Sequence, residues 1–164
     1  MTRYTTFTTR LGTIYATIDD DKQSGIYFDG GRHAPPIAPD WQEDPEARPF
    51  RALEQQLREY LAGRRRDFDL PLGPRGTSFQ VRVWEEIARI PFGETITYTQ
   101  LAARAGAPDA MRAAGAATGR NPLSIVVPCH RVVGSDGTLT GYAGGLDRTR
   151  QLLELEGVLQ PTLV

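Results

Sequence analysis

The sequence predicts an α/β (α+β) protein with a small N-terminal antiparallel sheet domain that carries one helix and a mainly helical C-terminal domain that contains a helix-turn-helix. Three observations lead to this prediction. Short β-rich runs separated by turns come first, helical periodicity dominates after residue 49, and two short helical segments joined by a glycine-bearing turn follow later. A stretch rich in proline and glycine at 67–76 is the best candidate linker, so we expect domains at 1–75 and 76–164.

The N-terminal domain should contain three short strands and one covering helix. Arg3–Phe7 and Thr13–Ile18 are rich in β-branched and aromatic residues and flank a hairpin turn at 11–12. A polar turn over 19–25 leads to a third strand at 26–28. Beyond Pro49, apolar residues recur at steps of three and four until a glycine ends the run, which predicts a helix on one face of the sheet.

The C-terminal domain should consist of short helices with clear start signals. Thr77-Ser78-Phe79-Gln80 has the form of a capping box and precedes an apolar stripe. A second helix begins at Thr97 or Tyr98, and an alanine-rich third helix covers 110–118. These last two helices form a helix-turn-helix candidate, whose second helix would contact DNA. The alternative explanation for the small residues of the helix at 110–118 is tight packing against neighbouring helices.

A reactive pair lies within the apolar stretch Ile125–Val133, which holds the only cysteine and one of two histidines. The apolar run 125–127 is typical of a buried strand. Pro128 cannot donate a ladder hydrogen bond, so strand pairing should be interrupted where Cys129 and His130 occur. Because successive side chains on a strand face opposite ways, these two can cooperate only if the backbone departs from regular extension. A structural buried cysteine stays open as an alternative.

Composition narrows the classes of function. The net charge is -1, with 19 basic and 20 acidic residues, which argues against a generic electrostatic binder of nucleic acid. One cysteine and two histidines allow no intramolecular disulfide and too few ligands for structural zinc, so we predict no metal and no cofactor. Since the sequence shows no signal peptide and no membrane-spanning run, we expect a soluble cytoplasmic monomer that does not bind membranes.

The cysteine motif and its surroundings closely resemble the O6-alkylguanine-DNA alkyltransferase family. The similarity runs from about Ser78 to Gly157 and includes Asn121-Pro122, the P-C-H-R-V motif at 128–132, the loop at 141–146 and the L-E-G end at 155–157. The resemblance implies a ribonuclease-H-like N-terminal sheet and repair of DNA by direct damage reversal. Cys129 would take the alkyl group from O6-alkylguanine once per molecule, with O4-alkylthymine left open as a second substrate.

The resemblance also implies roles for residues around the cysteine. His130 would accept the thiol proton through a water, and Glu156 would orient that histidine, which is the logic of a catalytic triad. Tyr98 would crowd the target phosphate and donate a proton toward the leaving guanine. Asn121 would tie the DNA-binding helices to the active-site segment. The base pocket would be formed by Val132, Tyr142, Ala143 and Gly144, with Ala143 at a position where many relatives carry a hydroxyl residue.

The partner implied by the resemblance is double-stranded DNA, bound through its minor groove in any sequence and with the target base flipped out. Arg112 would enter the duplex and fill the space that the base leaves. The residues expected to contact DNA are Tyr98, Arg112, Ala113, Ala114, Gly115 and Thr118. Rival interpretations are a non-catalytic lesion-binding protein, a helix-turn-helix regulator with a structural cysteine, and a cysteine hydrolase.

Overall fold

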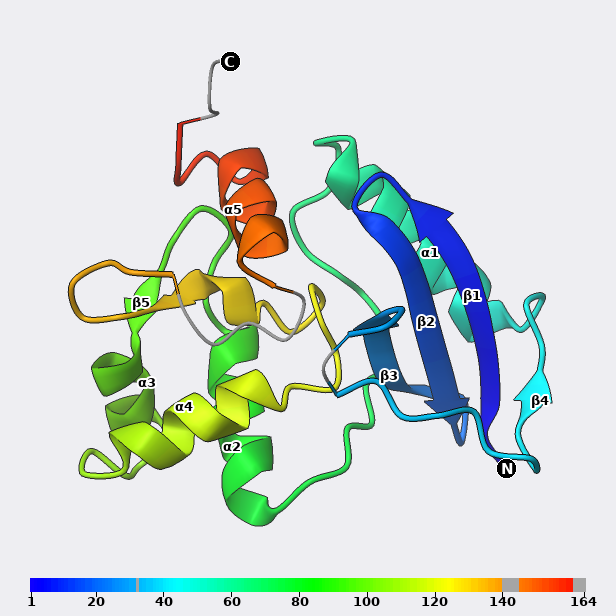
Figure 1. Cartoon of the computed structure of the whole chain (residues 1–164), viewed down its shortest axis with the longest axis horizontal. Helices are drawn as coiled ribbons and strands as arrows, with labels where there is room; N and C mark the ends of the chain where they lie inside the picture. Colours follow the sequence, from blue (N-terminus) through cyan, green and yellow to red (C-terminus); the bar gives the residue numbers. More distant parts are fainter. Residues whose placement is uncertain (32, 140–144, 161–164) are drawn as a thin grey trace. The chain divides into compact units, whose positions relative to one another are not determined.

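The computed structural model describes residues 1–31, 33–139 and 145–160 and divides into two compact units (Figure 1). The first unit contains Met1–Arg75 and the short segment Pro122–Ser124, and the second unit contains the rest of the chain. The mixed class predicted from the sequence is confirmed, because a sheet with one helix makes up the first unit and short helices dominate the second.

A four-stranded sheet in the order β3-β2-β1-β4 forms the first unit. Its strands are β1 (Arg3–Thr9), β2 (Gly12–Asp19), β3 (Lys22–Phe28) and β4 (Gln42–Glu43). The first three are antiparallel, as predicted, and β4 lies parallel to β1. β4 was not predicted, because two exposed polar residues carry no apolar pattern.

The turn between β2 and β3 is shorter than the polar stretch 19–25 suggested. Only Asp20 and Asp21 form it, with φ angles of +51° and +59°. A two-residue hairpin turn with both residues at positive φ has the twist that antiparallel strands need, and aspartate tolerates this conformation. Gln23 is therefore a buried strand residue, and its side-chain amide donates to the carbonyl of Pro49 at 2.8 Å.

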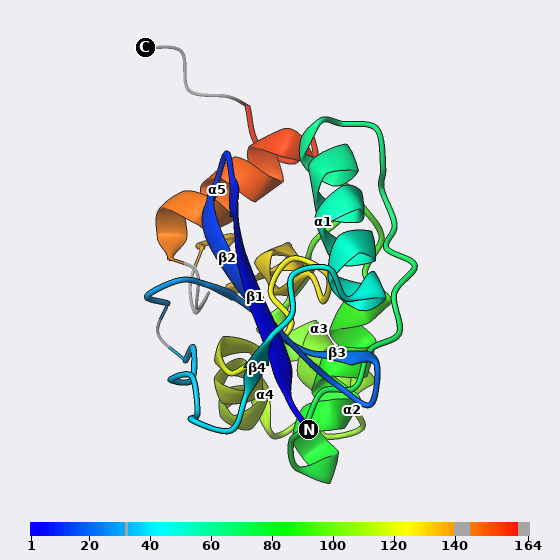
Figure 2. The same ribbon diagram turned by 90° about the vertical axis from the view of Figure 1, so that its right-hand side faces the viewer.

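Helix α1 (Arg48–Leu61) runs along one face of this sheet (Figure 2). Its proline at the first turn and its apolar spacing explain both its start and the face that it buries. The residues that α1 buries are Phe50, Leu53, Leu57, Tyr60 and Leu61. The core of the first unit is therefore a layer of helix on sheet.

The described residues of the second unit form four α-helices, a 3-10 turn and two very short parallel strands. They are α2 (Ser78–Ala88), β5 (Ile96–Thr97), α3 (Tyr98–Arg104), α4 (Met111–Gly119), η1 (Cys129–Arg131), β6 (Val132–Val133) and α5 (Leu146–Leu155). Capping boxes begin both α2 and α3, with Thr77 and Thr97 as the N-caps. α3 and α4 pack together across the turn at 105–110, as expected of a helix-turn-helix.

The prediction of a buried strand over 125–127 is wrong. These residues are buried, yet they form a turn in which Ile125 has a φ of +72°. An apolar run indicates burial but does not by itself distinguish a strand from a buried turn. A β-branched residue in the left-handed region is strained, so the surrounding packing must hold this turn in place. The chain then enters η1 directly, which places Cys129 and His130 on one tight turn.

Candidate active site and nucleic-acid interface

Cys129 begins the 3-10 turn η1 and is only 3% exposed. Pro128 precedes it with φ -81° and ψ 68°, which is outside the extended conformation of a strand. Burial raises the pKa of Cys129 to about 12, although hydrogen bonds from the Asn121 side chain and from backbone groups of Cys129 and His130 oppose this rise. The resting thiol is therefore protonated, and a base must take its proton before sulfur can attack.

His130 and Glu156 form a buried pair within the second unit. The imidazole Nε2 lies 2.8 Å from Oε2 of Glu156, and both side chains are fully buried. Burial lowers the pKa of His130, as does the nearby Arg131 charge, and together they outweigh the opposite effect of Glu156. The imidazole is accordingly neutral at pH 7 and is able to accept a proton.

The Glu156 carboxylate also binds a guanidinium. Nε of Arg131 donates to Oε1 and Nη2 donates to Oε2, both at 2.8 Å, in a parallel bidentate arrangement. The backbone N–H of Gly93 donates to Oε1 at 3.3 Å. Glu156 is the C-cap of α5, so the end of this helix is joined to η1 and to the turn at residue 93.

Asn121 lies just after α4 and is buried. Its Nδ2 donates to the carbonyl of Val127 at 2.8 Å, and its side chain also bonds the thiol of Cys129. One amide thereby joins the end of α4 to the turn that carries the cysteine. The predicted site residues Cys129, His130, Glu156 and Asn121 are brought together in one hydrogen-bonded cluster.

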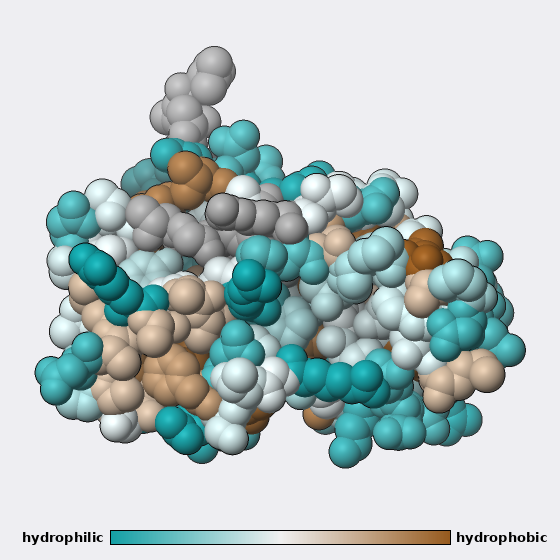
Figure 3. Space-filling view, turned by 60° about the horizontal axis from the view of Figure 1, so that its bottom comes forward, coloured by the Kyte–Doolittle hydropathy of each residue, from teal (hydrophilic) through white to brown (hydrophobic). Residues whose placement is uncertain are grey.

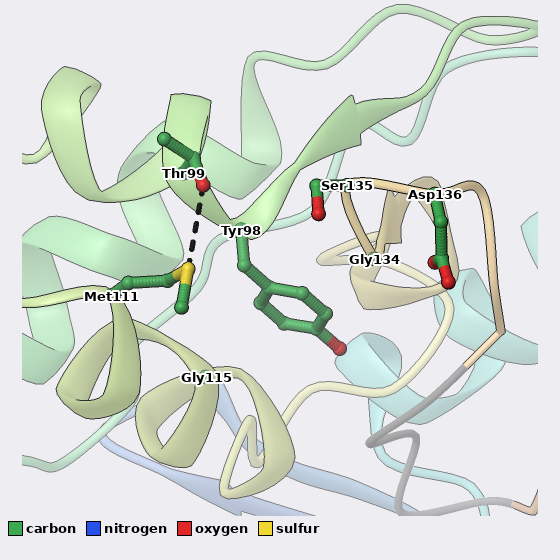
Figure 4. A pocket seen from close by; sticks show the side chains of 7 residues that line it. All are labelled: Tyr98, Thr99, Met111, Gly115, Gly134, Ser135 and Asp136. Atoms are coloured by element: carbon green, nitrogen blue, oxygen red, sulfur yellow. Dashed lines mark hydrogen bonds between the residues drawn. The ribbon is translucent and has the colours of Figure 1, made fainter.

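A pocket of about 490 Å³ lies on the surface of the second unit beside α3 and α4 (Figure 4). Its lining residues are Tyr98, Thr99, Met111, Gly115, Gly134, Ser135 and Asp136. The ring of Tyr98, the first residue of α3, lies across the pocket between α4 and the turn at 134–136. The Thr99 hydroxyl donates to the sulfur of Met111 at 3.3 Å, which holds one wall together.

Helix α4 presents one exposed face and one buried face. Met111, Arg112 and Ala113 are exposed, and Figure 3 shows a weakly apolar area flanked by hydrophilic side chains on its lower left, where α3 and α4 lie. Ala114 and Thr118 are 0% and 1% exposed, so both belong to the core of this unit. We had expected these two side chains to contact DNA, and their burial within the helix packing corrects that expectation.

Val132 is buried in β6, directly after η1. Tyr142, Ala143 and Gly144, the other residues predicted for the base pocket, lie outside the described residues. Among the residues that the structure describes there is no cluster of side chains that could hold a metal ion, and no helix is both long and apolar enough to cross a membrane.

Sequence reasoning missed the contribution of Arg131 and the pocket residues Met111 and Ser135. Arginine is rarely buried, so the sequence suggested for Arg131 only a place in the P-C-H-R-V motif and in a modest basic face, whereas the side chain is buried. Arg131 directly follows His130, and His130 was expected to bond Glu156. This neighbourhood was the one signal that could have predicted the ion pair between Arg131 and Glu156. Met111 and Ser135 meet only through the tertiary fold, and no spacing in the sequence relates them.

The fold and this site together define a class of protein: a two-unit, cysteine-dependent protein with a helix-turn-helix of the kind that binds DNA. Two family models match the chain. The 6-O-methylguanine DNA methyltransferase, ribonuclease-like domain, matches residues 2–74, and the DNA binding domain of the same methyltransferase matches residues 78–158. The chain therefore belongs to the 6-O-methylguanine DNA methyltransferase family, and the resemblance noted in its sequence is confirmed.

Individual relatives agree with this assignment. A methylated-DNA--protein-cysteine methyltransferase of Methanosarcina acetivorans is 44% identical over 154 residues, which cover 94% of this chain and 97% of the relative. A protein of the same name from Mycobacterium bovis is 53% identical over 116 residues, which cover 71% of this chain and 69% of the relative. The crystal structure of Mycobacterium tuberculosis OGT in complex with DNA has a TM-score of 0.87 at 42% identity, covering 94% of this chain and 92% of that one.

Proposed function

We propose that the protein repairs DNA by transferring the alkyl group of O6-alkylguanine to the sulfur of its own Cys129. The observation that carries this proposal is the buried cluster in which the only thiol of the chain adjoins His130, and His130 is hydrogen-bonded to Glu156. Relatives named methylated-DNA--protein-cysteine methyltransferases and a relative solved in complex with DNA support the same reaction.

The reaction is a direct displacement at the alkyl carbon. A bond forms between Sγ of Cys129 and this carbon as the bond from the carbon to O6 of guanine breaks. His130 takes the thiol proton, and the negative charge that develops on the leaving guanine is neutralised by a proton from Tyr98. The product is S-alkylcysteine, a stable thioether, so each molecule reacts once and is both catalyst and acceptor.

The high pKa of Cys129 fits this one-use chemistry. A thiol whose pKa is raised to about 12 by burial is protected from casual oxidation, because oxidation proceeds through the thiolate. Deprotonation then accompanies substrate binding, with Asn121 and backbone N–H groups stabilising the sulfur anion as it forms. A reducing compartment keeps such a thiol usable, and we propose the cytoplasm.

Double-stranded DNA is the proposed partner. The exposed face of α4 is slim enough to lie in a minor groove, and Arg112 extends from its first turn. Ala113 and Gly115 add to this face, while the Tyr98 pocket takes the backbone of the flipped nucleotide. Val132, Tyr142, Ala143 and Gly144 surround the base. Lesions occur in any sequence, so contacts with backbone and groove suffice, and the protein acts as a monomer without a cofactor.

Mass measurement of the protein tests the proposal. Excess protein is mixed with a duplex that contains O6-methylguanine, and the protein and its peptides are weighed. We expect the peptide that holds Cys129 to gain one CH2, with no more than one transfer per molecule. The variant Cys129→Ala should bind the same duplex and gain nothing. Binding by the native protein with no gain in mass would instead identify a non-catalytic lesion-binding protein, and a parallel duplex with O4-methylthymine measures substrate range.

A further inference from the structure

We propose that Arg131 is a positioning residue: it keeps the Glu156 carboxylate ionised and oriented, and thereby holds His130 as the neutral imidazole whose Nδ1 accepts the Cys129 proton. This inference rests on the proposed function, because it concerns how the thiol loses its proton. It adds Arg131 to the cysteine, histidine and glutamate that the family resemblance implied.

The protonation state follows from counting donors on the carboxylate. Arg131 is always charged and directs two N–H groups at Glu156, and the backbone N–H of Gly93 is a third donor. A carboxylate that accepts from these groups is ionised. If Nε2 of His130 lacked its hydrogen, two acceptors would face each other at 2.8 Å. Nε2 therefore carries the hydrogen, and in a neutral imidazole the other nitrogen is then the acceptor.

The charge of Arg131 decides whether the imidazole stays neutral. The guanidinium and the carboxylate cancel, so a proton added to His130 would leave a net positive charge in a buried cluster, which is costly. The charged groups that act on His130 are Glu156, from the end of α5, and Arg131, its neighbour in η1. Cys129 is the adjoining titratable group. Without Arg131, the uncompensated carboxylate would stabilise the imidazolium, and the base would be lost at neutral pH.

The surroundings of Arg131 require a planar fork and not only a positive charge. Nη1 donates to the carbonyl of Ile90 at 2.6 Å, while Nε and Nη2 are used by Glu156. The ring of Phe92 lies 5.8 Å from the guanidinium carbon. A lysine ammonium could supply the charge but could not make the paired bonds to both carboxylate oxygens. The orientation of Glu156, and through it of His130, therefore depends on arginine.

Nuclear magnetic resonance of the unmodified protein is the first test. The chain has two histidines, and His33→Gln identifies the signals of His130. Long-range proton–nitrogen spectra from pH 5 to 9 should show the neutral form with hydrogen on Nε2 at pH 7 and a midpoint below the usual value of about 6.5. Hydrogen on Nδ1, or an imidazolium at pH 7, overturns the inference without any variant.

The second test measures the rate of alkyl transfer against pH for two variants. In Arg131→Gln the pKa of His130 rises, so the acidic limb of the rate profile should move up by at least about one pH unit, with a loss that approaches about tenfold at pH values below both midpoints and recovery by pH 9. Arg131→Lys keeps the positive charge but loses the paired bonds to Glu156. It should leave the acidic limb of the profile in place and lower the rate at the high-pH plateau about tenfold. Arg89→Gln, which removes an exposed arginine paired with Glu86, should match the native profile.

The outcomes separate this inference from the proposed function. If the native protein transfers no alkyl group, the proposed function fails, while the histidine spectra still report whether Nε2 carries the hydrogen. If the native protein reacts but Arg131→Lys reaches the native rate at high pH, the paired guanidinium bonds are not needed and the inference fails. A loss in Arg131→Gln that is equal at every pH also contradicts it, since that pattern indicates damaged structure. If Arg131→Gln does not fold, Arg131→Lys and the native spectra decide.

Discussion

At the scale of single residues, the site is a buried cluster with no net charge. Burial raises the pKa of Cys129 and lowers the pKa of His130, and both shifts favour the neutral thiol and the neutral imidazole. The charged pair formed by Arg131 and Glu156 is bidentate, and the two side chains also bond the carbonyl of Ile90 and the N–H of Gly93. A buried pair of this kind adds little net stability but makes the loss of either partner severe.

Glu156→Gln should therefore destabilise the fold far more than the loss of one negative charge would suggest. The amide cannot balance the Arg131 guanidinium, whose side chain is 7% exposed, so an uncompensated charge remains inside. We expect the free energy of unfolding to fall by about 3–5 kcal/mol, measured by denaturant titration. Glu85→Gln, an exposed glutamate on α2, is the matched control and should change it by less than about 0.5 kcal/mol. Equal effects would show that the buried pair is not special.

At the scale of elements, α3 and α4 present the surface that we propose contacts DNA, and their positions depend on how they start and pack. α3 begins with a capping box, and Tyr98 is its first residue. α4 is packed through Ala114, Ala117 and Thr118, whose small side chains allow close approach to α2 and α3. The alternative that the sequence left open, tight helix packing, therefore accounts for the buried side of α4, while its exposed side remains available for a duplex.

Arg112→Ala should separate base flipping from chemistry. Arg112 is exposed on the first turn of α4, whereas Cys129 and His130 are buried in η1. If it fills the space left by the flipped base, its loss should slow repair of O6-methylguanine in duplex by at least about tenfold, the cost of roughly 1.4 kcal/mol in the barrier. Reaction with free O6-benzylguanine, which needs no flipping, should change by less than about twofold. Equal losses on both substrates would remove this role.

Thr97→Ala should weaken both the fold and the repair of duplex DNA. Its side chain accepts from the N–H of Gln100, and removing such a cap costs about 0.5–2 kcal/mol. Because Tyr98 directly follows the cap, fraying of α3 should also slow repair in duplex. Thr77→Ala removes the equivalent cap of α2 and serves as the control. It should cost similar stability in a melting experiment but leave the repair rate of the folded protein unchanged, and a slowing as large as that of Thr97→Ala would count against a specific role of α3.

Elements with local signals were predictable, and those set by tertiary contacts were not. The capping box of α2, the start of α3, the apolar spacing of α1 and the first hairpin are encoded within a few residues, and all were found where predicted. The capping box of α3 was not predicted, although Thr97 and Gln100 have the same spacing. The turn at 125–127 was mistaken for a strand, because burial of an apolar run does not determine its φ angles. β4 pairs with β1 across nearly forty residues and carries no pattern of its own. The resemblance supplied Glu156, but only the structure revealed its bond to Arg131.

At the scale of the whole molecule, the chain passes between the two units three times. It leaves the first unit after Arg75, returns for Pro122–Ser124, and leaves again before the segment that carries Cys129. Within the first unit this returning segment is bonded to β3: the N–H of Ile26 donates to the carbonyl of Pro122 at 2.7 Å, and the N–H of Ser124 donates to the carbonyl of Ile26 at 3.0 Å. The sequence predicted only the first crossing, because a segment of three residues is too short to carry a pattern that assigns it to the first unit.

This threading predicts that the units unfold together and that Leu123 matters to both. Leu123 is 0% exposed in the first unit and lies six residues before Cys129, so Leu123→Ala should lower the free energy of unfolding by about 2–5 kcal/mol. The fluorescence of the two tryptophans follows the unfolding of each unit separately, since Trp41 belongs to the first unit and Trp84 to the second.

Trp84→Phe leaves Trp41 as the reporter, and Trp41→Phe leaves Trp84. In denaturant titrations in these two backgrounds, Leu123→Ala should lower the unfolding midpoint by the same amount with either reporter. Leu146→Ala, at a side chain 57% exposed, is the control and should move neither midpoint. A shift seen by Trp41 alone would mean that the units fold independently despite the shared segment.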